Sequence, residues 1–325
     1  MNNKLPNVVQ LIIATLRLSV TAPDITDRFA AAGEVDWPAL LGYADEHGLT
    51  SALYEAYKRA GVLPYVPPAA LARMTQLHGE NYRRQTCNRA EWLEIHRVLT
   101  EANVPHLLLN DSAFLVAPGM IRAGRQALQA AEVKQTRTKL RTSLWNQRWQ
   151  GLRVNEPRFL WRDVQTRPVM GVPMPVFSNE YTVIYRAVCF AGRLIEGRAR
   201  LHQLLDVACL LQQFPHLDWE RIWAEVTQAG LVRFVYTSIF LAHHIFDAPL
   251  PSMNIWKRLA SVTPPALINW LEQSAETELL AAPHQPSFTP KDYRLALLAA
   301  ASLRERLSVI CFGTLGSYRQ WGKLW

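Results

Sequence analysis

One short strand-like stretch, in a chain otherwise patterned as helices, most constrains the fold. Residues 104–109 are apolar and are followed by Asn110-Asp111, a pair typical of the turn after a buried strand. Residues 152–164 and 169–177 could add strands to the same sheet. Because the remaining stretches carry apolar residues at helical spacing, the sequence predicts an α+β, mostly helical fold. We expect a small mixed sheet with extensive N- and C-terminal helices.

The N-terminal region has clear helix start and stop signals. Asp36 can accept hydrogen bonds from first-turn N–H groups, and the following Trp37-Pro38 suits the start of a helix. Gly48 can take the left-handed conformation that ends it. A second helix is predicted over 49–60, and a long one over about 69–101.

The same signals recur later in the chain at the same spacing. Asp36-Trp37, Gly48 and Tyr54 correspond to Asp218-Trp219, Gly230 and Tyr236. The shared start and stop chemistry of helix-turn-helix pairs explains so short an echo. Two copies do not indicate a solenoid, which needs at least about three repeats.

Composition places the chain among globular proteins. Of its 325 residues, 49% are hydrophobic and 19% charged, which permits a sizeable buried core. No apolar run reaches the roughly 18 residues that cross a bilayer, and the N-terminus lacks a secretion signal pattern. The 4 cysteines are scattered without CxxC spacing, as in proteins of reducing compartments. These features predict a cytoplasmic protein.

The net charge of +8 is concentrated in one segment. Residues 122–167 contain eleven basic and three acidic residues, while the rest of the chain is balanced. Three interpretations stay open: a solvated helix face, a surface for an anionic protein or peptide, and a nucleic-acid groove with stacking tryptophans. Between the last two, an anionic protein or peptide is preferred. The candidate anion- or partner-binding residues are Arg122, Arg125, Lys134, Arg137, Arg141, Trp145, Arg148 and Trp149.

The C-terminal tail is aromatic and basic. Residues 318–325 read Tyr-Arg-Gln-Trp-Gly-Lys-Leu-Trp, which suggests a docking segment. Its target is the protein's own body, a partner or a membrane surface.

Other polar groupings have structural explanations. Asp111-Ser112 is interpreted as a turn or helix N-cap, because residues 112–116 look helical. His243 and His244 are adjacent on a predicted helix and cannot face one metal ion. His202 and Asp206 share a helix face, which favours a structural hydrogen bond. We find no nucleophile elbow, P-loop or dinucleotide-binding motif.

Several stretches of the chain together carry a family resemblance. They are Asp36-Trp37 through Tyr54, the long helix and residues 104–109, then Leu-His-Gln-Leu-Leu-Asp-Val-Ala-Cys-Leu-Leu at 201–211 and the stretches 216–222, 229–231 and 248–251. In order and spacing they resemble the bacterial "uncharacterised nucleotidyltransferase" family, whose genes often lie beside polysaccharide or modified-peptide biosynthesis genes. The resemblance covers roughly residues 8–255, and no single motif is diagnostic.

The resemblance implies a site that binds metal and phosphate in relatives. They read approximately Leu-Lys-Gly after the first strand, then Arg-x-Gly-Asp-x-Asp-Leu at the second, with a further carboxylate on a later strand. Paired carboxylates one residue apart on a strand point the same way and can clamp Mg²⁺, which neutralises a triphosphate.

This chain departs from that pattern at every metal-binding position. Asn110 and Asp111 replace the lysine and glycine, and Arg125 and Ala127 replace the paired aspartates within the aligned stretch 122–128. Phe159 stands where the later carboxylate is expected. The sequence therefore predicts no catalytic residues, no bound metal and no other cofactor.

We expect three regions: N-terminal helices over 1–100, a degenerate nucleotidyltransferase-like core over 101–178, and C-terminal helices over 179–325. The predicted function is non-catalytic, a binding or scaffold role in a biosynthetic or modification pathway. One alternative is an active or remodelled phosphate-substrate enzyme. The other is nucleic-acid binding through residues 122–167.

Overall fold

The computed structural model describes most of the chain, and its contacts divide it into two compact units. The described residues are 7–19, 21–31, 35–110, 113–117, 119–133, 139–141, 143–144, 148–149, 152–153, 160–280 and 294–310. The helical unit comprises residues 1–78, 147–155 and 183–325, and the sheet unit comprises 79–146 and 156–182. The predicted division into three regions stays a prediction.

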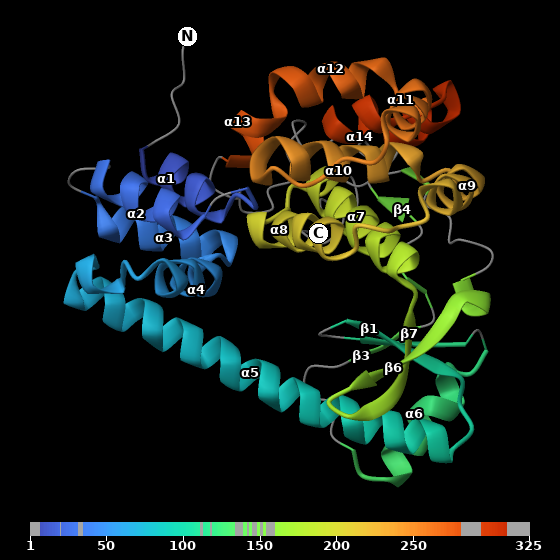
Figure 1. Cartoon of the computed structure of the whole chain (residues 1–325). Helices are drawn as coiled ribbons and strands as arrows, with labels where there is room; N and C mark the ends of the chain where they lie inside the picture. The colour runs from blue at the N-terminus through green and yellow to red at the C-terminus, as the bar shows by residue number, and fades with distance from the viewer. Residues whose placement is uncertain are drawn as a thin grey trace, which may run out of the picture. The chain divides into compact units, whose positions relative to one another are not determined.

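The sheet unit is built on five strands in the order β3-β2-β1-β7-β6 (Figure 1). The pairs β1–β2 and β6–β7 are antiparallel, while β1–β7 and β2–β3 are parallel. The sheet is therefore mixed and small, which confirms the predicted fold class. The strands are β1 (His106–Asn110), β2 (Ala113–Val116), β3 (Lys139–Arg141), β6 (Val164–Val169) and β7 (Val172–Phe177).

Strand boundaries differ from the prediction in three places. Residues 113–116 form β2 instead of a helix, because four apolar residues show no period and the hairpin with β1 decides their conformation. Residues 160–163 form a 3-10 turn, η2 (Leu160–Asp163), instead of continuing a strand. The stretch 169–177 is divided by a two-residue turn, where Met170 has φ 55° and Gly171 φ 80°.

Two helices pack against this sheet. The C-terminal part of α5 (Pro68–Glu101) contributes Ile95 and Leu99 to a core shared with Phe114 of β2. Helix α6 (Ile121–Ala130) contributes Leu128, which is also buried. A Cβ at Gly124 would lie 3.3 Å from both Leu99 Cδ2 and Leu140 Cδ1, so the glycine permits the close approach of α6.

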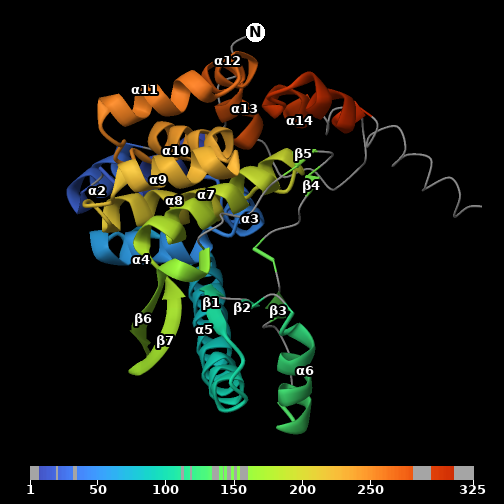
Figure 2. The same ribbon diagram turned by 90° about the vertical axis from the view of Figure 1, so that its right-hand side faces the viewer.

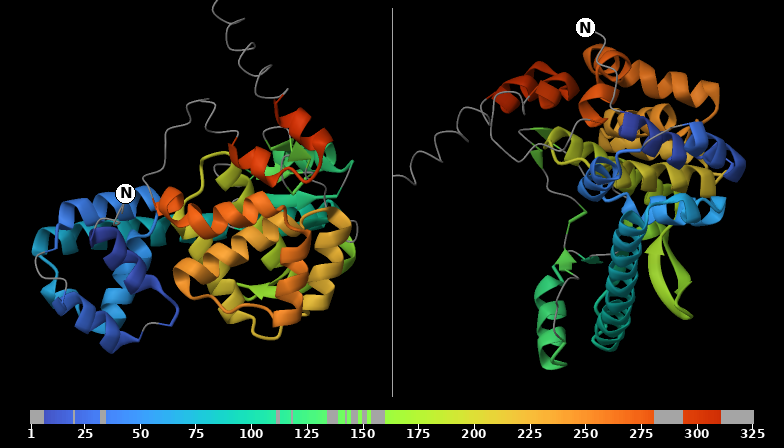
Figure 3. Two further views of the ribbon diagram at one scale, coloured as in Figure 1. Left: turned by 90° about the horizontal axis from the view of Figure 1, so that it is seen from above. Right: turned by 90° about the vertical axis from the view of Figure 1, so that its left-hand side faces the viewer.

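The helical unit is arranged around α10 (Val232–Phe246), which is buried along nearly its whole length (Figures 1 and 3). A short hairpin, β4 (Arg148–Trp149) with β5 (Leu152–Arg153), also belongs to this unit. Its other helices are α1 (Asn7–Leu16), α2 (Ala22–Ala31), α3 (Trp37–His47), α4 (Thr50–Ala60), η1 (Leu63–Tyr65), α7 (Asn179–Ile195), α8 (Leu201–Gln213), α9 (Trp219–Ala229), α11 (Met253–Val262), α12 (Pro265–Gln273), α13 (Ala275–Leu280), α14 (Arg294–Ala299) and a helix over 303–310.

The predicted helix signals are confirmed. Asp36 accepts a hydrogen bond from the Ala39 N–H at 3.0 Å, and Gly48 ends α3 with φ 70°. The long helix begins one residue before the predicted start and ends at Glu101 as predicted. Within the described residues, no helix is long and apolar enough to span a membrane.

Candidate functional site

Helix α6 presents two arginines on the face that turns away from the core. Leu128 and Gly124 are buried against the sheet, and Ala127 packs beside them. Arg122 and Arg125 are exposed and stand three residues apart, so their side chains lie next to each other on the helix surface. The helix therefore displays two positive charges while its other side completes the core.

Strand β3 adds a third exposed arginine, Arg141. This strand pairs in parallel with β2, with Arg141 opposite Leu115, and it contacts α6. None of Arg122, Arg125 and Arg141 forms an ion pair with another described residue. Their charges are therefore not neutralised by the part of the protein that the structure describes.

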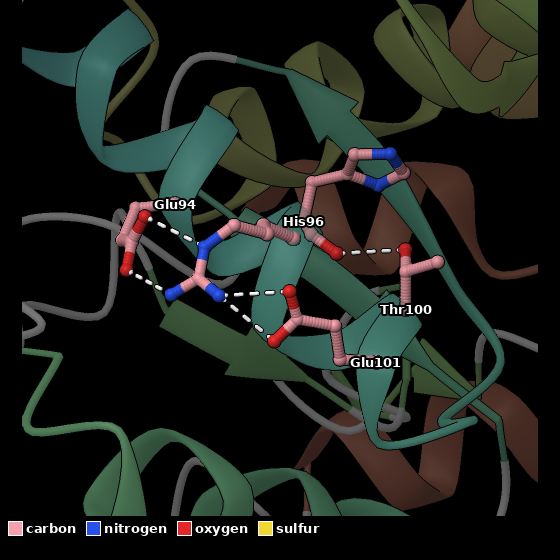
Figure 4. Close-up of polar contacts among 5 residues, drawn as sticks. Glu94, His96, Thr100 and Glu101 are labelled. Carbon is pink, nitrogen blue, oxygen red and sulfur yellow. Dashed lines mark hydrogen bonds and ion pairs between the residues drawn. The ribbon is translucent and has the colours of Figure 1, made fainter.

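Arg97 of α5, in the same unit, shows the opposite arrangement (Figure 4). Its guanidinium donates to Glu94 at 2.7 Å and to Glu101 at 2.8 Å, one turn on either side along the helix. Hydrogen bonding to these carboxylates raises the pKa of Arg97 above its usual range. The contrast shows that exposed arginines of this unit can be paired locally, whereas those of α6 and β3 have no acidic partner among the described residues.

A pair of histidines joins α5 to β1. His106 Nδ1–H donates to the Val104 carbonyl at 2.7 Å, so His106 Nε2 accepts from His96 Nδ1–H at 2.8 Å. Burial lowers the pKa of both imidazoles; at His96 the Pro173 carbonyl opposes this, because it can accept a hydrogen bond from the second ring nitrogen only when the ring is protonated. The sequence analysis missed this pair. The one available signal was a polar residue, His106, in an otherwise apolar strand.

The structure brings together only part of the predicted binding set. Arg122, Arg125 and Arg141 belong to the sheet unit, whereas Arg148 and Trp149 form β4 in the helical unit. Asn110 ends β1. Five further predicted positions lie outside the described residues: Asp111, Lys134, Arg137, Trp145 and Phe159.

The other polar groupings have structural roles. His202 Nδ1–H donates to the His47 carbonyl at 2.9 Å, and Asp206 pairs with Arg186 at 3.5 Å, so both residues tie α8 to other helices. His243 donates to the Ala248 carbonyl at 2.8 Å. Among the described residues, no group of three or more His, Cys, Asp and Glu is placed to hold a metal ion.

Comparison with known families identifies the class of protein. A family model described as "Uncharacterised nucleotidyltransferase" matches residues 33–111 and 129–247. These stretches cover more than half of the chain, so the chain belongs to this family of nucleotidyltransferase-like proteins. The comparison with curated proteins gave no match, and neither did the comparison with solved structures.

The stretch that resembles the second-strand motif of the family lies on a helix in this structure. Residues 122–128 align with a motif expected at the second strand, yet they lie within α6, and the matched ranges omit residues 112–128. The strand that follows β1 is β2. Arg122, Gly124 and Leu128 share residue types with the motif, and Gly124 and Leu128 serve here as contacts of a helix with the core.

The described residues at the aligned metal positions do not fit a divalent cation. Arg125 presents an exposed positive charge, and Ala127 offers no ligand atom. At an effective dielectric near 20, a guanidinium about 4 Å from a divalent cation would repel it by about 4 kcal/mol for each unit of the cation's charge.

Proposed function

We propose that this chain is a non-catalytic member of its family that acts by binding an anionic protein or peptide, as a partner or scaffold in a biosynthetic or modification pathway. The observation that carries the proposal is the group Arg122, Arg125 and Arg141, which is exposed and has no acidic partner among the described residues. Arginine forms bidentate hydrogen bonds with carboxylates, which suits an acidic segment of a partner.

The carboxylates of the family motif are incomplete in either placement. If residues 122–128 are aligned with the motif, Arg125 and Ala127 occupy both positions. If the motif is placed instead at the beginning of β2, the two residues with that spacing are Asp111 and Ala113. One carboxylate cannot replace the pair that clamps Mg²⁺ in two-metal phosphoryl transfer. Both placements therefore support a role without nucleotidyl transfer.

The retained helices support a binding role as well. The family match extends through α7, α8, α9 and α10, the helices that form the centre of the helical unit. A relative that keeps these helices while the aligned metal-binding residues are replaced is what a binding role would leave behind.

Capture of partners from a lysate of the native host, with charge-reversed variants, tests the proposal. The variant Arg122→Glu/Arg125→Glu should lose at least about tenfold of the captured partner, because two attractive pairs become repulsive. The variant Arg83→Glu/Arg84→Glu is the matched control, since both arginines are exposed in the same unit. Its capture should stay within about twofold of the unchanged protein.

Three results would contradict the proposal. Equal loss in both variants would show that only net charge matters. If instead calorimetry shows that the purified chain binds ATP and that the Arg125→Glu variant does not, the remodelled phosphate-substrate enzyme is favoured. Affinity for single-stranded nucleic acid that falls steeply with salt would favour the nucleic-acid alternative.

A further inference from the structure

The last described helix, over residues 303–310, is fixed on the helical unit by one face. The Glu305 carboxylate accepts two hydrogen bonds from the Arg233 guanidinium of α10, at 2.9 and 3.2 Å. Arg233 is 7% exposed, and Val309 is fully buried. These contacts hold the helix in one rotation about its axis, so the direction of its opposite face is determined.

That opposite face is apolar and exposed to solvent. Leu303, Leu307 and Ile310 are 73%, 53% and 50% exposed. They stand four and three residues apart, the spacing that places side chains on one face of a helix. Figure 2 shows this helix in red next to α14, at an edge of its unit. Three large apolar side chains together form a surface patch, unlike the single apolar residues common on protein surfaces.

Positive charge borders the patch on both sides. Arg304 and Arg306 flank the apolar stripe, both are exposed, and neither pairs with a described acidic residue. The only acidic residue of this helix, Glu305, points inward to Arg233. The outward surface therefore combines apolar side chains with two arginines.

The sequence that follows continues the same chemistry. Residues 311–325 contain Tyr318, Trp321 and Trp325 together with Arg319 and Lys323, and no aspartate or glutamate. Tyrosine and tryptophan favour the interface between lipid headgroups and acyl chains, and basic residues near it are attracted to anionic lipids.

We propose that the helix over 303–310 forms a docking surface for an anionic lipid bilayer. Leu303, Leu307 and Ile310 would enter the headgroup boundary while Arg304 and Arg306 contact lipid phosphates, as in helices that lie in the membrane interface. A bilayer requires no matching shape, and its negative charge complements the arginines. The proposal concerns a different unit from Arg122, Arg125 and Arg141 and is independent of the proposed function.

Flotation of the purified full-length chain with lipid vesicles tests this proposal. The protein should float with vesicles of phosphatidylcholine mixed with phosphatidylglycerol, and at least about tenfold less with phosphatidylcholine alone. The variant Leu303→Asp/Leu307→Asp should reduce flotation on the anionic vesicles at least about tenfold.

A matched control separates the patch from net charge. Met253 and Val262 of α11 are also large, apolar and exposed, at 63% and 53%, so Met253→Asp/Val262→Asp changes charge and exposed apolar surface by a similar amount. This control should float like the unchanged protein. The variant Arg304→Glu/Arg306→Glu should lose binding on anionic vesicles.

Three outcomes would overturn the proposal. They are no flotation of the unchanged protein on anionic vesicles, equal loss in the α11 control, and equal flotation on neutral and anionic vesicles. A self-associating chain that becomes monomeric in Leu303→Asp/Leu307→Asp, without floating on vesicles, would assign the patch to a second copy instead.

Discussion

The two helix-turn-helix pairs of the helical unit, α3–α4 and α9–α10, share one backbone geometry but differ in their surroundings. Asp36 and Asp218 have nearly the same dihedral angles, φ −72° and ψ 86° against φ −75° and ψ 88°. Gly48 and Gly230 both have φ 70°. The two stop glycines are nonetheless packed differently.

The difference is a contact between α3 and α8, which lie far apart in the sequence. At α3, His202 of α8 donates to the His47 carbonyl, and the Leu201 N–H donates to His47 Nδ1 at 3.4 Å. A Cβ at Gly48 would lie 2.6 Å from His202 Nδ1, whereas a Cβ at Gly230 would meet nothing within 4 Å. Local chemistry therefore forms both turns, while only the first turn is also held by a second helix.

Replacing the two glycines should give the largest difference. Gly48→Ala is expected to lower the free energy of unfolding by about 3 kcal/mol, because the left-handed conformation and the contact with His202 both oppose a Cβ. Gly230→Ala should cost only about 1 kcal/mol. Urea denaturation followed by circular dichroism measures both values. Equal losses would show that the His202 contact does not matter.

A double-mutant cycle separates the two causes at Gly48. In a His202→Ala background, Gly48→Ala should cost about as much as Gly230→Ala, because the crowding atom is gone. A loss that stays near 3 kcal/mol in this background would assign the effect to the backbone alone.

Replacing His47, which is fully buried, should give the next largest effect. His47→Ala gives α3 the residue that α9 has at the same place, Ala229. We expect a loss of about 2 kcal/mol, from the cavity and from the Leu201 N–H that loses its acceptor. Thermal or urea unfolding checks this value. A neutral result would mean that the first turn needs no support beyond its own sequence.

The two N-caps should give smaller and equal effects. Asp218 accepts from the Arg221 N–H at 3.0 Å, the distance that Asp36 keeps from Ala39. Asp36→Ala and Asp218→Ala should each cost about 1 kcal/mol. Asn at either position should restore most of the loss, because its side-chain oxygen still accepts. Clearly unequal losses, or no rescue by Asn, would break the parallel between the two pairs.

The smallest expected effect is the pH dependence of stability that comes from the histidine pair of the sheet unit, His96 and His106. Burial lowers the pKa of His96 and His106 below 6.5, so the folded state binds protons less readily than the unfolded state. Their contribution to stability is therefore fully present above about pH 6.5 and is lost as the pH falls below it.

Urea midpoints at about pH 7.5 and about pH 5.5 test this dependence. The variant His96→Gln/His106→Gln should show a smaller difference between the two midpoints. Substitution of the exposed His216 by Gln should leave the difference unchanged. An unchanged pH dependence in the double variant would exclude a contribution from the pair.

Local signals explain what the sequence could predict. Asp36 and Gly48 mark the ends of α3 through bonds within a few residues, so neighbouring sequence is sufficient to place them. Strand β2 has no such mark: four apolar residues suit a helix or a strand, and pairing with β1 decides between them. The turn at Met170-Gly171 was missed for a related reason, because a methionine at positive φ is not a turn signal.

The candidate site could be predicted only in part, because it depends on contacts far apart in sequence. The excess of positive charge between residues 122 and 167 drew attention to Arg122, Arg125 and Arg141, which are exposed, and their binding role stays a prediction. Sequence alone could not show that Arg148 and Trp149 pair into a hairpin of the other unit. It also could not predict the His47–His202 contact, whose partners are 155 residues apart.

We propose that this family member binds a partner without transferring nucleotides. The most direct measurement incubates the purified full-length chain with host lysate, Mg²⁺ or Mn²⁺, and each labelled nucleoside triphosphate in turn. We expect no incorporation of label above that of lysate alone, with or without EDTA. Incorporation that requires the purified chain and disappears with EDTA would contradict it.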